Sequence, residues 1–318
     1  MTLRQQIRLN RLRTAGLLAV FGLLVALLAG VVYVIYGTGG AITVVVVGLA
    51  WAIFSWFFSA SAVAATTGAR VVTKPEQPQL YRIVENMSIA AGLPMTPEVR
   101  IVDDPAPNAF AAGRDPKHTY VAVTTGLLET MDQRELEGVI SHEIAHVQHR
   151  DVRLMTLVAV LVGVIALVSD IALRMLYFGG GRRRSSGGAA DIIFLAVGIA
   201  GLIVAPIAAA LIQMAVSRRR EYLADAGGAE ISGDAEGLAL ALRKLALDPR
   251  EIRDTSRSTA HLYIEGPLGK ASGLRSSLSG LFSTHPPLED RIAKLEEIGG
   301  FHLTPLSPGT VAGTDPVT

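Results

Sequence analysis

The chain has 318 residues, of which 50% are hydrophobic, and its mean hydropathy is +0.41. This composition is too apolar for an ordinary soluble domain and is typical of a membrane protein. The formal net charge of +1 gives no sign of a nucleic-acid partner. The absence of cysteine excludes disulfides, thiolate metal sites and a cysteine nucleophile, and is compatible with a reducing compartment.

Two hydrophobic segments open the chain. Four arginines within residues 1–13 precede an apolar run at 15–36, which is long enough to cross the hydrocarbon core of a bilayer. A Gly-Thr-Gly-Gly turn then leads to a second apolar run at 41–65. A signal peptide is the alternative for the first run, although its apolar core exceeds the usual ~7 to 15 residues. We predict a transmembrane hairpin over residues 1–66.

From residue 67 onward the composition is that of a globular domain. Residues 77–91 have the periodicity of an amphipathic helix, and three short runs at 98–102, 108–112 and 119–124 are typical of strands. We expect these strands to form a small antiparallel sheet. Its position next to the following helix matters, because proteases commonly bind substrate as an extra strand on an exposed sheet edge.

The segment 132–150 is predicted to be a helix and contains His142-Glu143-Ile144-Ala145-His146. Asp132, with Glu135 three residues later, resembles a capping box at the start of this helix. On a helix, positions i and i+4 lie on one face, so both imidazoles can bind one metal ion while Glu143 lies beside it. This geometry is typical of a zinc hydrolase.

Zinc catalysis requires three protein ligands and an open position for water, so a third ligand must lie elsewhere. Glu221 and Asp225 are candidates because they lie at i and i+4 of a predicted helix. Glu221 can bind the metal while Asp225 hydrogen-bonds one of its ligands. Taken alone, Glu221 could equally be an ordinary acidic residue beside three arginines. His149 is excluded because it lies two turns from His142, about 10.5 Å along the helix axis.

Two more apolar segments of spanning length, 154–178 and 192–216, lie between the histidines and Glu221. A single metal site requires this pair to return to the side from which it started, so both segments cross the membrane or neither does. Basic residues next to the catalytic parts place these parts in the cytoplasm by the positive-inside rule. Three arginines at 182–184 argue against a crossing pair; we nevertheless favour crossing.

The order and spacing of these motifs resemble a known family. HExxH, two hydrophobic segments and Arg-x-x-Glu-x-x-Ala-Asp at 218–225, with Asn108-Ala109-Phe110-Ala111 before and Thr284-His285-Pro286-Pro287 after them, resemble the HtpX family. These are membrane-bound zinc metalloproteases related to the endopeptidases that process prenylated CAAX proteins. The resemblance covers residues 10–297. It implies a mainly α membrane protein with about four transmembrane helices and an α+β, gluzincin-type zinc protease domain.

The predicted organisation has five parts. They are a transmembrane hairpin (1–66), the first part of the protease domain (67–153), a second hydrophobic hairpin (154–216), the second part of the protease domain (217–300) and a disordered tail (301–318). We predict one zinc ion per chain, held by His142, His146 and Glu221.

Further residues have predicted roles around this zinc ion. Glu143 would act as the base, and Asp225 would orient a ligand. The resemblance makes His285 a candidate to stabilise the tetrahedral oxyanion, although it could simply cap the last helix. It also makes Asn108 a candidate substrate contact, although a residue after proline is more often a turn former.

The predicted function is that of a zinc-dependent endopeptidase in the cell membrane, with its catalytic domain facing the cytoplasm. Its expected partners are the lipid bilayer and protein or peptide substrates, in particular misfolded or damaged membrane proteins. This role in quality control rests on the resemblance, whereas the hydrolysis rests on the residues. The alternatives are a processing protease for specific membrane-associated substrates, such as prenylated proteins, and a metal-binding membrane scaffold without proteolysis.

Overall fold

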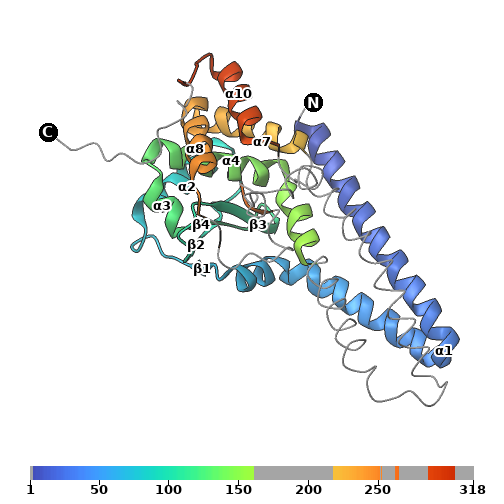
Figure 1. Cartoon of the computed structure of the whole chain (residues 1–318). Coiled ribbons are helices and arrows are strands. Elements are labelled where there is room, and N and C mark those ends of the chain that lie inside the picture. The colour runs from blue at the N-terminus through green and yellow to red at the C-terminus, as the bar shows by residue number, and fades with distance from the viewer. Residues whose placement is uncertain (1–2, 161–217, 251, 253–261, 265–285, 305–318) are drawn as a thin grey trace.

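The structure, a computed structural model, describes residues 3–160, 218–250, 252, 262–264 and 286–304. Figure 1 shows a compact part, made of a small sheet and short helices, from which the long helix α1 projects. The expected spans at 154–178 and 192–216 lie outside the described residues from residue 161 on. The expected tail at 301–318 lies outside them from residue 305 on.

Helix α1 (Leu3–Thr67) reverses its direction at Gly37, which has φ 71° and ψ −164°. Glycine adopts this left-handed conformation without the steric cost that other residues carry. The two arms therefore form a V that opens from the tip, as Figure 1 shows, and the reversal coincides with the glycine turn expected at 37–40. They approach closely, since a Cβ on Gly48 would lie only 2.7 Å from a methyl group of Val25.

The second arm of α1, Gly37–Thr67, is long and apolar enough to cross a membrane, and no other helix in the described ranges is. The first arm contains a shorter apolar stretch, Leu12–Leu23. Several large apolar side chains of the second arm are exposed: Ile42, Val46, Val47, Leu49, Ile53 and Phe57. Four transmembrane helices were predicted, and the described residues contain one such candidate; the domain boundaries stay predictions.

The sheet has four strands: β1 (Arg70–Val71), β2 (Glu98–Val102), β3 (Ala109–Asp115) and β4 (His118–Thr124). Their order is β1-β2-β4-β3, with β2 parallel to β4 and the other pairs antiparallel. The expected strands are present, but the prediction of an antiparallel sheet was wrong. Strand β3 does not pair with β2; β4, which follows β3 after a tight turn, lies between β2 and β3. Strand periodicity reports which residues face a core, not which strands are neighbours.

Helices surround this sheet in the part of the chain that the structure describes. They are α2 (Pro78–Ala90), α3 (Thr125–Thr130), α4 (Gln133–His149), α7 (Arg218–Ser232), α8 (Ala235–Leu247) and α10 (Leu288–Gly299). Helix α4 begins at the predicted capping box: Asp132 accepts the N–H of Glu135 at 2.9 Å, and Glu135 accepts the N–H of Asp132 at 2.8 Å. This box satisfies two N–H groups that a helix start leaves without intrahelical partners.

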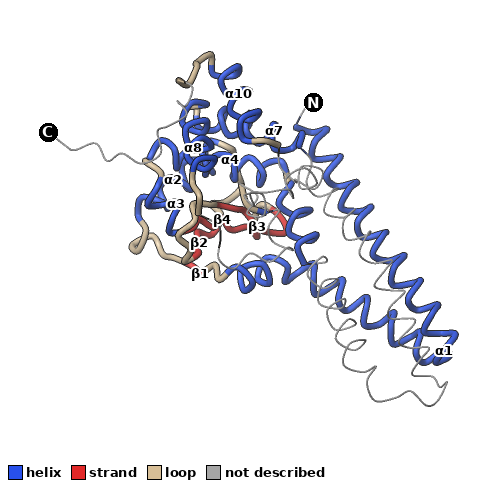
Figure 2. Tube along the Cα trace, viewed as in Figure 1, coloured by secondary structure: helices blue, strands red, loops and turns tan. Residues whose placement is uncertain are grey.

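Both faces of the sheet are buried, so the strands alternate between two hydrophobic clusters. One face packs on α4 with Val121, Val123, Val139, Ile140 and Ile144. The other face carries Phe110 and Tyr120, which meet Tyr263 and the end of α1. Figure 2 shows the strands enclosed by helices in this way. Burying each of these large side chains contributes about 1.5 to 3 kcal/mol, which holds α4 rigidly against the sheet.

Candidate metal centre

Two helices that are far apart in the sequence form the site. Helices α4 and α7 approach so closely that a Cβ on Gly228 would lie 2.9 Å from the backbone nitrogen of His142. Only glycine fits there without moving one helix, because real Cβ atoms essentially never come under 3.0 Å. Glu221 lies seven residues before Gly228, about two helical turns, and so shares its face. The close crossing therefore brings Glu221 to the two histidines.

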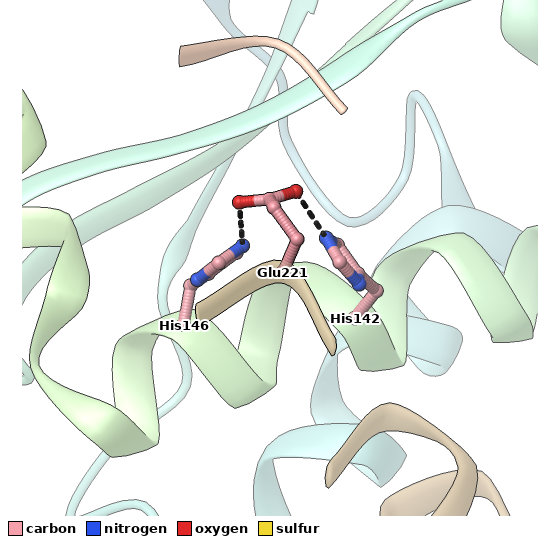
Figure 3. A group of neighbouring side chains, drawn as sticks. All are labelled: His142, His146 and Glu221. Atoms are coloured by element: carbon pink, nitrogen blue, oxygen red, sulfur yellow. Dashed lines mark ion pairs between the residues drawn. The ribbon is translucent and has the colours of Figure 1, made fainter. Parts of the chain in front are cut away.

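His142, His146 and Glu221 form a buried cluster whose ligand atoms lie within 4.8 Å of one another. The Nε2 atom of His142 lies 3.9 Å from Oε2 of Glu221, and Nε2 of His146 lies 3.7 Å from Oε1. Figure 3 shows the Glu221 carboxylate facing both imidazoles, with one oxygen toward each ring. The structure thus brings together the three residues predicted as metal ligands.

Each histidine is held on its other nitrogen by a buried carboxylate. Nδ1 of His142 lies 2.9 Å from Asp225, and Nδ1 of His146 lies 3.2 Å from Asp151. With Nδ1–H donating to a carboxylate, the lone pair of each ring is on Nε2, which faces Glu221. Asp225 therefore occupies the position expected of it. Asp151 was missed, although it follows His146 by only five residues.

Arg291, on α10, was also missed. It is fully buried and binds Asp225 in a bidentate manner, with Nη2 2.7 Å from Oδ1 and Nε 2.9 Å from Oδ2. Its Nη1 donates to the carbonyl of Ile264 at 3.0 Å and lies 3.7 Å from Glu221. Arg291 thereby anchors the carboxylate that holds His142. Nothing local in the sequence indicates this role, because 149 positions separate Arg291 from His142.

Burial and neighbouring charges shift the pKa values of these groups in different directions. Burial lowers the pKa of His142 to about 4, although Asp225 opposes it. Burial acts in the same direction on His146, but Asp151 and Glu221 outweigh it and raise that pKa to about 9. At Asp225 burial is likewise outweighed, and Arg291 with His142 holds the pKa of the carboxyl below its usual value. Near neutral pH, His142 is therefore the neutral imidazole that binds a cation, whereas His146 carries a proton that a cation would displace.

The donor set fits a divalent cation such as zinc. One nitrogen of each imidazole and one carboxylate oxygen lie within 4.8 Å of one another, close enough for all three to bind one cation. Two imidazoles and one carboxylate are the ligands of a common type of catalytic zinc site, and three ligands leave a position open.

Glu143 lies against the sheet and is not one of these donors. Its carboxylate accepts a hydrogen bond from the backbone N–H of Ala111 in β3, and burial raises its pKa to about 7. The carboxyl thus faces the outer edge of β3, because in the described part of the sheet β3 pairs only with β4. A carboxyl with this pKa can take up and release a proton near neutral pH.

Asn108 and His285 are not placed in the cluster. Asn108 is buried just before β3, where its side-chain oxygen accepts the N–H of Ala109 at 3.0 Å and its own N–H donates to Thr124 at 2.9 Å. These bonds shape the start of the strand, as expected of a turn former. His285 lies outside the described residues.

Comparisons with known proteins place this site in a family. Residues 74–299 match the family model described as peptidase family M48. Proteins named "Protease HtpX homolog" from Tropheryma whipplei (strain Twist), Pyrococcus furiosus and Lactobacillus acidophilus are 44%, 45% and 43% identical to this chain. These alignments cover 88%, 89% and 93% of this chain and 90%, 94% and 100% of those proteins. A crystal structure of S. mikatae Ste24p aligns with 92% of this chain and 67% of that chain, with 17% identity and a TM-score of 0.47.

The family match spans more than half of the chain, and the relatives align along nearly all of it. Because the His-His-Glu cluster lies inside the matched residues, the chain belongs to peptidase family M48 as an HtpX homologue and is a metallopeptidase.

Proposed function

We propose that the chain is a zinc-dependent endopeptidase of the cell membrane that cleaves misfolded or damaged membrane proteins at the cytoplasmic face. The observation that carries the proposal is the buried cluster of His142, His146 and Glu221 next to Glu143. Two histidines, one carboxylate and an adjacent acid suit one zinc ion per chain and hydrolytic chemistry. The role in quality control is supported by the resemblance to the HtpX family.

Each residue of the site has a distinct role in this proposal. Zinc, when bound, would polarise the scissile carbonyl and lower the pKa of a water molecule. Glu143 would accept a proton from the attacking water and pass it to the leaving amine. Asp225 and Asp151 would hold the two histidines in the tautomer that binds the cation. His285 remains our candidate for stabilising the oxyanion.

The outer edge of β3 is the surface on which we place the substrate. Ala111 donates its N–H from this edge to Glu143, and Ala109 accepts the N–H of Ile264 at 3.0 Å. The N–H of Ala111 on this edge therefore points toward Glu143, whereas the carbonyl of Ala109 pairs with Ile264 and the N–H of Gly113 donates to Thr156 at 3.0 Å. An extended peptide pairing with β3 would present its carbonyls next to Glu143. Asn108, at the start of this strand, remains the candidate for a further contact.

Placement at the membrane is supported by the two arms of α1. The second arm has the length and composition of a span, and its apolar side chains are exposed. The catalytic parts follow this arm and carry the basic residues expected on the cytoplasmic side. A metal centre on α4, close to the end of the hairpin, could reach loops and termini of neighbouring membrane proteins.

The test compares cleavage of a loosely folded protein, such as casein, by the detergent-purified chain and by two variants, all loaded with zinc. Glu143→Gln keeps the metal ligands but removes the base, so it should bind zinc as the wild type does and lose cleavage. Glu137→Gln removes a carboxylate from the same helix outside the cluster and should cleave normally.

Other outcomes separate the alternatives. Cleavage by Glu143→Gln at the wild-type rate would show that Glu143 is not the base. Cleavage of one defined bond in one substrate would indicate a processing protease. No cleavage by the wild type at full zinc occupancy would favour a metal-binding scaffold.

A further inference from the structure

A small, strongly basic pocket lies away from the metal centre, where three parts of the chain meet. It is bordered by the first arm of α1, the turn between β3 and β4 and the end of α4, and its cavity volume is about 30 Å³. Its polar lining includes Thr14, Arg114, Asp115, Thr119, Arg150 and Arg153. The lining thus contains three arginines and one aspartate.

The carboxylate is turned toward its own loop. Asp115 lies 2.9 Å from Nδ1 of His118 and accepts the backbone N–H groups of Lys117 and His118, while the Nε of Arg114 is 3.6 Å away. Asp115 is the one carboxylate among the lining residues, against three arginines, so the lining is basic. Such a pocket favours an anion.

Two of the arginines also contact aromatic residues of α1. Arg153 lies over the ring of Trp56 at 3.8 Å, and Arg114 lies over the ring of Phe57 at 5.2 Å. Stacking engages the face of a guanidinium, whereas its N–H donors point outward in its plane. An anion in this pocket would therefore be next to the apolar surface of α1.

Arg150 reaches the pocket from an uncommon backbone conformation. It ends α4 with φ 61°, and it is the one non-glycine residue with positive φ in the described ranges. Glycine or asparagine usually occupies this position at the end of a helix. Arginine has no conformational advantage at this position, so we attribute its presence to its side chain.

The distance of the pocket from the tip of α1 is close to the thickness of the hydrocarbon core of a bilayer. Phe57 lies about 20 residues after the tip at Gly37, and Thr14 about 23 residues before it. At 1.5 Å per helical residue these distances are about 30 and 34 Å, close to the ~30 Å thickness of a hydrocarbon core. If the tip is at the far surface, the arginines are at the level of the near headgroups.

We propose that this pocket binds the anionic, phosphate-bearing headgroup of a membrane phospholipid, with the acyl chains lying along α1. The inference rests on the membrane placement in the proposed function. Arg150 and Arg153 flank Asp151, which holds His146. A bound lipid would therefore set the height of the metal centre above the membrane.

The test uses the full chain reconstituted in phosphatidylcholine vesicles that contain increasing amounts of brominated phosphatidylglycerol. Bromine quenches tryptophan fluorescence on contact, and the chain has two tryptophans, both in α1, with Trp56 next to Arg153. We expect the wild type to be quenched more strongly by brominated phosphatidylglycerol than by brominated phosphatidylcholine. Arg114→Gln and Arg150→Asn should each reduce this preference about fivefold, the usual effect of one basic residue near an anionic lipid surface.

Two controls define the source of the anion. Lys117→Gln removes one charge from the same turn, but Lys117 does not line the pocket, so it should lower the lipid preference less than Arg114→Gln does. An equal reduction would show only general attraction to the anionic surface and would overturn the pocket assignment. Inorganic phosphate should reduce the preference more than sodium chloride of equal ionic strength, because it carries the recognised group.

Each remaining outcome counts against a definite statement. Equal quenching by the two lipids in the wild type would overturn the inference while leaving the membrane placement intact. Stabilisation of the wild type by inorganic phosphate without a lipid preference would identify free phosphate as the ligand and overturn the lipid assignment. Absence of quenching by either lipid would overturn both the inference and the membrane placement. Cleavage is not measured, so the proposed peptidase activity does not affect the result.

Discussion

Replacing Arg291 with methionine should reduce both the stability and the metal affinity of the protein. Arg291 is fully buried and forms two short hydrogen bonds with Asp225. Methionine fills similar space without a charge, so Asp225 would remain as an uncompensated buried carboxylate. Removing one partner of a buried ion pair costs about 3 to 5 kcal/mol. In domains of about 150 to 250 residues, that corresponds to a fall in melting temperature of roughly 6 to 20 °C.

The metal affinity should fall through a separate effect. Asp225 holds Nδ1 of His142 at 2.9 Å, and Arg291 anchors Asp225. Removing the carboxylate partner of a ligand weakens metal binding about 10- to 100-fold, so removing its anchor should weaken binding by up to that factor. A double variant, Arg291→Met with Asp225→Leu, should recover much of the melting temperature, because replacing both partners of a buried pair by apolar groups is nearly neutral. It should not recover the metal affinity, since the double variant removes the carboxylate that holds His142.

The assay combines thermal melting in detergent with zinc titration against a competing chelator. Arg291→Lys restores a charge without the bidentate geometry and should fall between the wild type and Arg291→Met. Arg82→Met, on the exposed face of α2, is the control for loss of an arginine. If Arg291→Met melted within about 2 °C of the wild type and bound zinc equally well, the reasoning on this buried network would be refuted.

Three further predictions concern the helix crossing, the metal and an ion pair at the start of α8. Gly228→Ala should lower zinc affinity, because the new Cβ would lie 2.9 Å from the backbone nitrogen of His142 and must push α7 away. The overpacking should destabilise the fold by about 1 to 3 kcal/mol, partly offset by the better helix propensity of alanine; zinc titration and thermal melting measure the two effects. Chelation should lower the melting temperature of the wild type but not of His146→Ala, because a cation that binds only the folded state at 100 times its Kd stabilises it by about 2.7 kcal/mol. Hydrogen bonds from Arg134 hold the pKa of Asp234 below its usual value, so this pair stabilises the fold above about pH 4 and loses its effect as the pH falls further. Arg134→Gln should therefore melt below the wild type near neutral pH, and a pH series should show the difference shrinking in acid; a constant difference would contradict the linkage.

Several features of the fold followed from local patterns in the sequence. The capping box of Asp132 and Glu135, the spacing of His142 and His146 and the glycine turn at Gly37 are each determined within a few residues. Helical periodicity also placed Glu221 and Asp225 on one face. Such features are predictable because backbone geometry alone relates residues three or four positions apart.

The neighbours of each element were decided by the tertiary structure. Strand β4 lies between β2 and β3, which makes the sheet mixed and places β3 at the edge beside Glu143. Alternating side chains do not encode this order, because the same pattern buries a strand next to any neighbour. Chain connectivity and the packing of α4 select one arrangement.

The metal centre shows the same division between local and distant information. The sequence by itself indicated His142, His146 and Glu221 as candidate ligands, because their chemistry and helical spacing restrict the choice, and the structure brings the three together. Only the tertiary structure identified Asp151 and Arg291 as the groups that hold the ligands in place. Aspartate and arginine occur throughout the chain, and their roles depend on which of them are buried together. That depends on the close crossing of α4 and α7 and on the docking of α10, which no local pattern specifies.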